Sequence, residues 1–203
     1  MRYFDTDLFG KVFVTLFVIM DPIGNVPIFL GLVRGRTPRA RRRAAWQSVV
    51  VALGVVTVFA LLGQQILHYL GITVPALQGA GGLLLLLVAL QLLTGQDSSH
   101  EAVDEVNIAL VPLGTPLIAG PGAIVAVIVF VQRAHGMRDA LAIFAGVTLV
   151  HVIIWLALRF SLGLNRLLRE NGIHLLTRVF GLLLSAIAVQ LIAEGAIGFS
   201  HQA

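Results

Sequence analysis

The chain has 203 residues, 58% of them hydrophobic and only 12% charged, and its mean hydropathy is +0.94. A soluble domain carries roughly 25% charged residues, so this chain has too little polar surface to cover a globule in water. The absence of cysteine excludes a disulfide framework and thiolate-ligated metal, and the net charge of +4 comes largely from arginines between apolar runs, which indicates membrane orientation and no nucleic-acid partner.

Six apolar segments, separated by polar stretches, are predicted to cross the membrane. Each has about the 20 residues that span roughly 30 Å of hydrocarbon, and in lipid such segments satisfy their backbone polar groups as helices. We therefore expect one all-α transmembrane domain over residues 1–203. The predicted spans are Leu8–Val33, Ala44–Leu67, Val74–Leu93, Ile108–Val131, Ala140–Phe160 and Leu175–Phe199.

The first span is interrupted near its middle by residues 21–27, DPIGNVP. Proline removes a helical N–H group and clashes with the preceding turn, and glycine allows non-helical torsions. Asp21-Pro22 is also a typical helix start, with Asp as N-cap and Pro at the first helical position. The pattern predicts two half-helices, with a new helix N-terminus deep in the membrane.

Arginine content predicts the orientation of the chain. By parity, one side of the membrane carries ten Lys and Arg residues and the other side carries four. The positive-inside rule places the richer side in the cytoplasm and both termini outside. The ten are Arg34, Arg36, Arg39, Arg41, Arg42, Arg43, Arg159, Arg166, Arg169 and Arg178.

The third span resembles the sixth. Leu77–Leu93 and Leu176–Ile192 align at an offset of 99 with eight identical pairs in 17, including Gly82 with Gly181. Each half then holds three spans, an odd number, so the second half (105–203) enters the membrane opposite to the first (1–96). Such a 3+3 inverted repeat is a common build for secondary transporters; chance similarity of leucine-rich helices is the alternative.

The fourth span is interrupted at a matching place. Residues 115–122, TPLIAGPG, lie about ten residues into the span, and Gly122 aligns with Gly24 at an offset of 98. Gly120-Pro121 can start a second half-helix, with glycine as a weaker cap than aspartate. The first and fourth spans are therefore both predicted to be discontinuous.

Two breaks at the midplane suggest a binding site for a small zwitterionic solute. A half-helix N-terminus attracts an anionic group, and freed carbonyls at the preceding C-terminus suit a cation. The alternative is a pair of proline kinks that only help helices to pack. The candidate substrate-binding residues are Asp21, Pro22, Gly24, Asn25, Thr115, Pro116, Gly120, Pro121 and Gly122.

Other polar residues within spans are weaker candidates. Asp21 and His151 could carry a coupling proton, although capping and packing are their plainer roles. Gln91 and Gln190 are repeat-related secondary candidates, with interhelical hydrogen bonding as the alternative. Glu194 lies near a span end, where hydration alone would accommodate it. No nucleophile, metal or nucleotide motif is present, so we expect no enzyme, no metal site and no cofactor beyond H⁺ or Na⁺.

Three motifs resemble the MarC family of bacterial and archaeal membrane proteins. They are DPIGNVPIF at Asp21–Phe29, VPLGTPLIAGPGAI at Val111–Ile124 and GGLLL at Gly81–Leu85, and the resemblance covers essentially the whole chain. Similar family members are described as transporters of small neutral amino acids such as glycine and alanine. The resemblance implies that substrate class here; the antibiotic resistance in the family name is not carried over.

Together these patterns predict a secondary transporter of small neutral amino acids in the cytoplasmic (inner) membrane, surrounded by lipids and able to form a homo-oligomer. Export of a drug or metabolite by the same fold is one alternative. A non-transporting membrane enzyme or lipid-handling protein is another.

Overall fold

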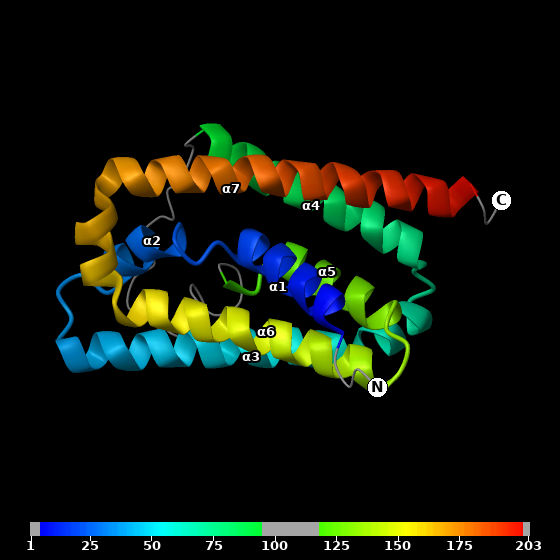
Figure 1. Cartoon of the computed structure of the whole chain (residues 1–203), viewed down its shortest axis with the longest axis horizontal. Helices are drawn as coiled ribbons and strands as arrows, with labels where there is room; N and C mark the ends of the chain where they lie inside the picture. The colour runs from blue at the N-terminus through cyan, green and yellow to red at the C-terminus, as the bar shows by residue number, and fades with distance from the viewer. Residues whose placement is uncertain (1–4, 95–117, 201–203) are drawn as a thin grey trace.

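The computed structural model describes residues 5–94 and 118–200, in which every regular element is a helix. Figure 1 shows the long helices lying roughly parallel or antiparallel in one bundle, with the start of α1 and the end of α7 at the same end. The helices are α1 (Thr6–Met20), α2 (Asn25–Leu32), α3 (Pro38–Tyr69), α4 (Val74–Thr94), α5 (Pro121–Gln132), α6 (Met137–Arg159) and α7 (Ser161–Ser200).

The all-α class is confirmed for the described residues, which hold four candidate membrane spans, or five if the bent pair α1 and α2 is counted as one span. Four helical stretches are long and apolar enough to cross a membrane: α3, α4, α6 and Gly172–Ser200 of α7. The fifth is the pair α1 and α2, which is bent by 47° at its break, so the predicted interruption of the first span is confirmed. In the fourth predicted span only α5 and the three residues before it are described; residues 108–117 lie outside the described part of the chain.

Two helices, α3 and α7, begin well before the predicted spans. The α3 helix starts at Pro38, where Thr37 Oγ1 accepts a hydrogen bond from the Ala40 N–H group at 3.3 Å. The loop predicted between the fifth and sixth spans is wrong, because α7 is helical from Ser161 onward. Its first three turns mix leucine with polar residues, a composition that suits an amphipathic helix. In Figure 1 these turns run across the end of the bundle before α7 changes direction.

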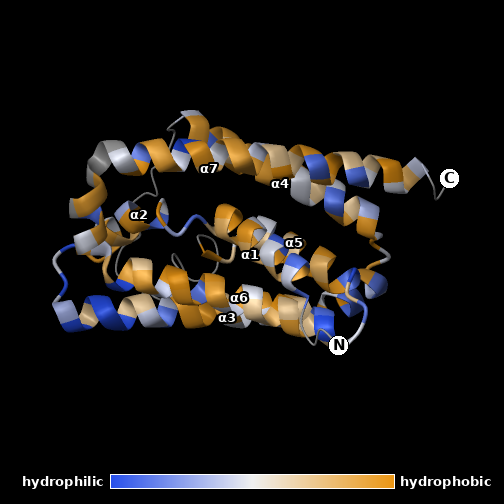
Figure 2. Cartoon of the chain, in the orientation of Figure 1, coloured by the Kyte–Doolittle hydropathy of each residue, from blue (hydrophilic) through white to orange (hydrophobic). Residues whose placement is uncertain are grey.

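Hydropathy follows this arrangement. Figure 2 shows hydrophobic residues along the middle of the long helices, and hydrophilic residues gathered where α2 joins α3 and where α5 joins α6. Large hydrophobic side chains are also exposed on the outside of the bundle, including Leu61, Phe144 and Leu182. An apolar exterior of this kind fits a chain whose solvent is lipid.

The α4 and α7 helices pack closely. They run antiparallel, since Gly79 in the first turns of α4 lies next to Gly195 near the end of α7. Near the middle of the pair, a Cβ atom on Gly82 would lie 2.7 Å from the carbonyl oxygen of Ala188. A Cβ atom on Gly181 would lie 3.2 Å from the carbonyl oxygen of Ala89. Glycine at both positions therefore lets the two backbones approach, as small residues do in membrane bundles.

Candidate functional site

The break in the first span is held by a side-chain clasp. The α1 helix ends at Met20, and Asp21 adopts a left-handed conformation with φ of +35°. The Asn25 amide nitrogen then donates to the carbonyl oxygens of Met20, at 2.6 Å, and of Asp21, at 3.0 Å. Asn25 is buried, and its amide pairs the Met20 carbonyl at the end of α1, where helix carbonyls lack intrahelical partners. The Asp21 carbonyl also accepts the Asn25 N–H group, at 3.2 Å.

The Asp21 carboxylate completes the clasp from the other direction. Its Oδ1 atom accepts a hydrogen bond from the Gly24 N–H group at 2.9 Å. Its Oδ2 atom is buried and has no hydrogen-bond partner among the described residues. A Cβ atom on Gly24 would lie 2.8 Å from Asp21 Cγ, so only glycine leaves room for this carboxylate.

The predicted start of the second half-helix is therefore wrong by a few residues. The α2 helix begins at Asn25, while Asp21 is the C-cap of α1. The physical reason is that aspartate tolerates the left-handed conformation and can bond a nearby N–H group through its side chain. Pro22 consequently lies in the turn rather than at the first helical position.

The α5 helix begins at the residue predicted for the second half of the fourth span. Gly120 is extended, with φ of −61° and ψ of 166°, and Pro121 is the first residue of α5. The Gly120 carbonyl oxygen accepts hydrogen bonds from the N–H groups of Ala123, at 3.0 Å, and Ile124, at 3.2 Å. Two other predicted site residues, Thr115 and Pro116, lie outside the described residues.

The structure brings the start of α5 close to the first break. A Cβ atom on Gly122, in the first turn of α5, would lie 2.9 Å from Leu85 Cγ and 3.4 Å from Ile19 Cγ2. Ile19 belongs to the last turn of α1, directly before Asp21. The end of α1, the start of α5 and the middle of α4 therefore meet around Gly122.

His151 lies apart from this clasp. It is buried in α6, and its Nδ1 atom is 2.8 Å from the Val147 carbonyl oxygen of the same helix. Its ring is directed to the backbone of Ala52 in α3, although Nε2 makes no hydrogen bond of good geometry with the described residues. The structure therefore places His151 between α3 and α6 and does not join it to Asp21.

The glutamine candidates also lie away from the breaks, but one of them belongs to a cluster around Glu194. Gln190 donates to Glu194 Oε1 at 3.0 Å, whereas Gln91 is exposed in the last turns of α4. Glu194 Oε2 accepts from Gln78 of α4 at 3.0 Å and from Arg133, directly after α5, at 2.5 Å. This network links α4, α5 and α7 at the end of the bundle where α1 begins.

Sequence reasoning missed this network. Gln78 stands in an otherwise apolar run and Glu194 is an acid within an apolar span, which together were a signal that each needed a partner. The partner could not be named, because Arg133 and Glu194 are 61 residues apart in the chain.

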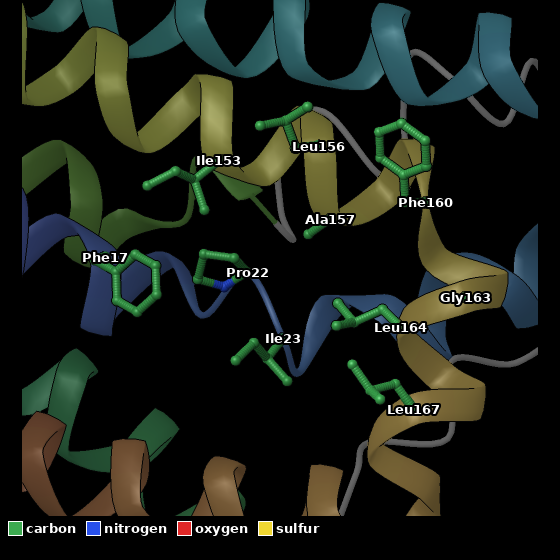
Figure 3. Close-up of a pocket in the computed structure, with 10 residues that line it drawn as sticks. All are labelled: Phe17, Pro22, Ile23, Ile153, Leu156, Ala157, Phe160, Gly163, Leu164 and Leu167. Atoms are coloured by element: carbon green, nitrogen blue, oxygen red, sulfur yellow. The ribbon is translucent and has the colours of Figure 1, made fainter.

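A groove of about 410 Å³ lies beside the first break. Figure 3 shows Phe17, Pro22 and Ile23 on one wall, with residues of α6 and of the first turns of α7, among them Leu156 and Leu164, opposite them. The walls are almost entirely apolar. The groove therefore offers no polar partner to a zwitterion and is distinct from the Asp21 clasp.

A multi-pass helical bundle with a first span broken around a buried carboxylate defines the chain as a polytopic integral membrane protein. The chain belongs to the MarC family of integral membrane proteins, whose family model matches residues 6–199.

Several curated relatives are similar over nearly their whole length. A UPF0056 membrane protein of Methanocaldococcus jannaschii is 37% identical, covering 96% of this chain and 98% of the relative. The UPF0056 membrane protein YhcE of Escherichia coli is 32% identical, covering 97% and 95%. A UPF0056 membrane protein of Aquifex aeolicus is 35% identical, covering 93% and 92%. No solved structure matches this chain significantly.

Proposed function

We propose that this protein is a secondary transporter of small neutral amino acids, with its substrate site between the two broken spans. The observation that carries the proposal is the buried Asp21 Oδ2 atom, which has no partner among the described residues and lies at an interrupted span. A buried carboxylate oxygen in a membrane protein requires a proton, a cation or a ligand group to offset its desolvation.

A small zwitterion fits the two breaks chemically. Its ammonium group would pair with Asp21 Oδ2, and its carboxylate would face the start of α5 at Gly120 and Gly122. Helix N-termini favour anionic groups through free N–H groups and the helix dipole. The start of α5 lies near the last turn of α1, since a Cβ atom on Gly122 would lie 3.4 Å from Ile19 Cγ2, so one small molecule would reach both ends.

The packing supports an inverted repeat over residues 1–96 and 105–203. At an offset of 99, Gly82 corresponds to Gly181 and Ala89 to Ala188, and the glycine of each helix faces the alanine of the other. The start of α1 and the end of α7 share one end of the bundle, as an even number of crossings requires.

The remaining assignments follow from this function. Transport without a nucleotide motif would be driven by H⁺ or Na⁺, with Asp21 as the first proton candidate and His151 as the second. Alternating access would rock one repeat against the other. The arginine-rich side would face the cytoplasm in the inner membrane, with both termini outside, and no enzymatic activity is assigned.

Counterflow of radiolabelled alanine in proteoliposomes tests the proposal. Vesicles preloaded with alanine or glycine should accumulate external label, and Asp21→Asn should abolish this accumulation while Ser48→Ala retains it. Ser48 is a matched control because it is buried but bonds only the Ala44 carbonyl of its own helix, at 2.8 Å.

Other outcomes would favour other functions. Absence of amino acid counterflow together with movement of a larger drug-like solute would replace the proposal by an exporter. Turnover of a lipid by the purified protein without any solute movement would replace it by a membrane enzyme. Measuring the same vesicles with imposed pH and Na⁺ gradients separates the coupling ions.

A further inference from the structure

The apolar groove beside the first break is separate from the proposed transport site at Asp21. Figure 3 shows Phe17, Pro22 and Ile23 facing Leu156 and Leu164 across an open space. Phe160 and Leu167, at its outer edge, are 61% and 79% exposed. The groove therefore opens to the outside of the bundle, and its occupant is apolar where it meets the walls.

The position of the groove indicates what that occupant is. It lies at the arginine-rich end of the bundle, where α6 ends at Arg159 and the helical turns of α7 begin to run across the bundle. On that outer side a spanning helix meets hydrocarbon, and the end of the helix meets the headgroup region. An acyl chain attached to a headgroup matches both environments.

Charge supports an anionic headgroup. The Arg159 guanidinium lies 5.7 Å from the ring centroid of Phe160, one of the residues that line the groove. Among the described side chains Arg159 has no ion-pair partner, since the one ion pair found there joins Arg133 and Glu194. A guanidinium binds phosphate through two parallel hydrogen bonds and is itself weakly hydrated.

We propose that the groove is a binding site for an anionic phospholipid, with one acyl chain against Pro22 and Ile23 and the phosphate on Arg159. The lipid acyl chain would cover the outer side of the interrupted helix and keep water from the turn at Asp21–Gly24. The inference is independent of the solute that the protein carries.

Photolabelling tests the site directly. The probe is phosphatidylglycerol with a diazirine in the middle of one acyl chain, at low mole fraction in phosphatidylcholine vesicles that hold the full chain. Mapped labels should concentrate on the end of α6, the start of α7 and residues 22–23. Gly163→Phe should reduce this labelling, because Gly163 lines the groove and has open space where a side chain would begin.

Two matched controls make the result decisive. Gly54→Phe adds the same bulk to α3 in equally open space outside the groove, and should leave labelling unchanged. Arg159→Gln should lower the preference for phosphatidylglycerol over phosphatidylcholine about fivefold, the effect of one cation near an anionic lipid. Arg138→Gln, at the other end of α6, should leave the preference for phosphatidylglycerol unchanged.

Labelling spread evenly over α3 and α6, or undiminished by Gly163→Phe, would overturn the groove as a lipid site. An unchanged headgroup preference in Arg159→Gln would overturn the assignment of the phosphate to this residue.

Discussion

Replacing Asn25 by alanine removes the donor that holds the first break together. The amide makes two hydrogen bonds, at 2.6 Å to the Met20 carbonyl and at 3.0 Å to the Asp21 carbonyl, and Asn25 is only 6% exposed. A buried group that loses its partner costs roughly 1–3 kcal/mol. The Asp21 carbonyl keeps its bond from the Asn25 N–H group, so the Met20 carbonyl carries most of the loss. We expect the free energy of unfolding to fall by about 1–3 kcal/mol.

Thermal unfolding in detergent micelles measures this loss. For a chain of this size, about 1 kcal/mol lowers Tm by roughly 2–4 °C, so Asn25→Ala should lower it by roughly 2–12 °C. Asn25→Asp keeps the shape but loses the donor, and it should be at least as destabilising. Ser48→Ala is the control, because the Ala44 carbonyl that Ser48 bonds lies within a continuous helix.

The clasp interpretation predicts a clear difference between these variants. Surface substitutions usually change the free energy of unfolding by no more than about 0.5 kcal/mol. If the free energies of unfolding of Asn25→Ala and Ser48→Ala differ by no more than that, the Asn25 amide does not stabilise the break. In that case Asn25 would be left as a ligand-binding residue alone, and its loss should appear in alanine binding with stability preserved.

Three further predictions concern glycines and the polar network. Gly24→Ala should displace the Asp21 carboxylate and abolish amino acid counterflow, while Gly10→Ala, which has open space, should retain it; equal counterflow in both would contradict the proposed site. Gly82→Leu should lower the free energy of unfolding by about 1–3 kcal/mol or more through overpacking of α4 on α7, and an unchanged Tm would refute that close packing. Glu194→Gln should weaken the Arg133–Glu194 link between the end of α5 and α7. The measurement is the rate of maleimide labelling at a cysteine introduced beside residue 194 in this cysteine-free chain, which should rise. An unchanged rate would show that the link does not hold this end of the bundle closed.

Sequence patterns were sufficient for the elements whose signal is local. Proline and glycine near the middle of an apolar run predicted the bend between α1 and α2, because no other residues interrupt a helix so strongly. The start of α5 at Gly120-Pro121 was predicted for the same reason. Length and apolar content were enough for the continuous spans.

Other features of the structure could not be predicted, because they depend on contacts between residues that are distant in the sequence or on the conformation of a whole turn. The left-handed conformation of Asp21 placed the start of α2 at Asn25, and this conformation depends on the clasp as a whole. The first turns of α7 are predicted as a loop, because their polar residues lower the apolar signal, although their helix propensity is retained. The partners of Glu194 come from two other helices, and only tertiary packing could reveal them.

The exchange between Gly82 and Gly181 has a consequence for how such a chain could arise. A polypeptide of about one hundred residues ending after α4 would carry both Gly82 and Ala89, the two residue types that face each other in the α4–α7 contact. Two copies inserted in opposite directions would then recreate the α4–α7 contact as a homodimer. Such a pair depends on equal amounts of both orientations, whereas a tandem fusion fixes the ratio at one to one. If the chain arose by such a fusion, each half would have been free to change on its own, and the Asp21–Asn25 clasp of the first half would have no copy at Gly120–Gly122.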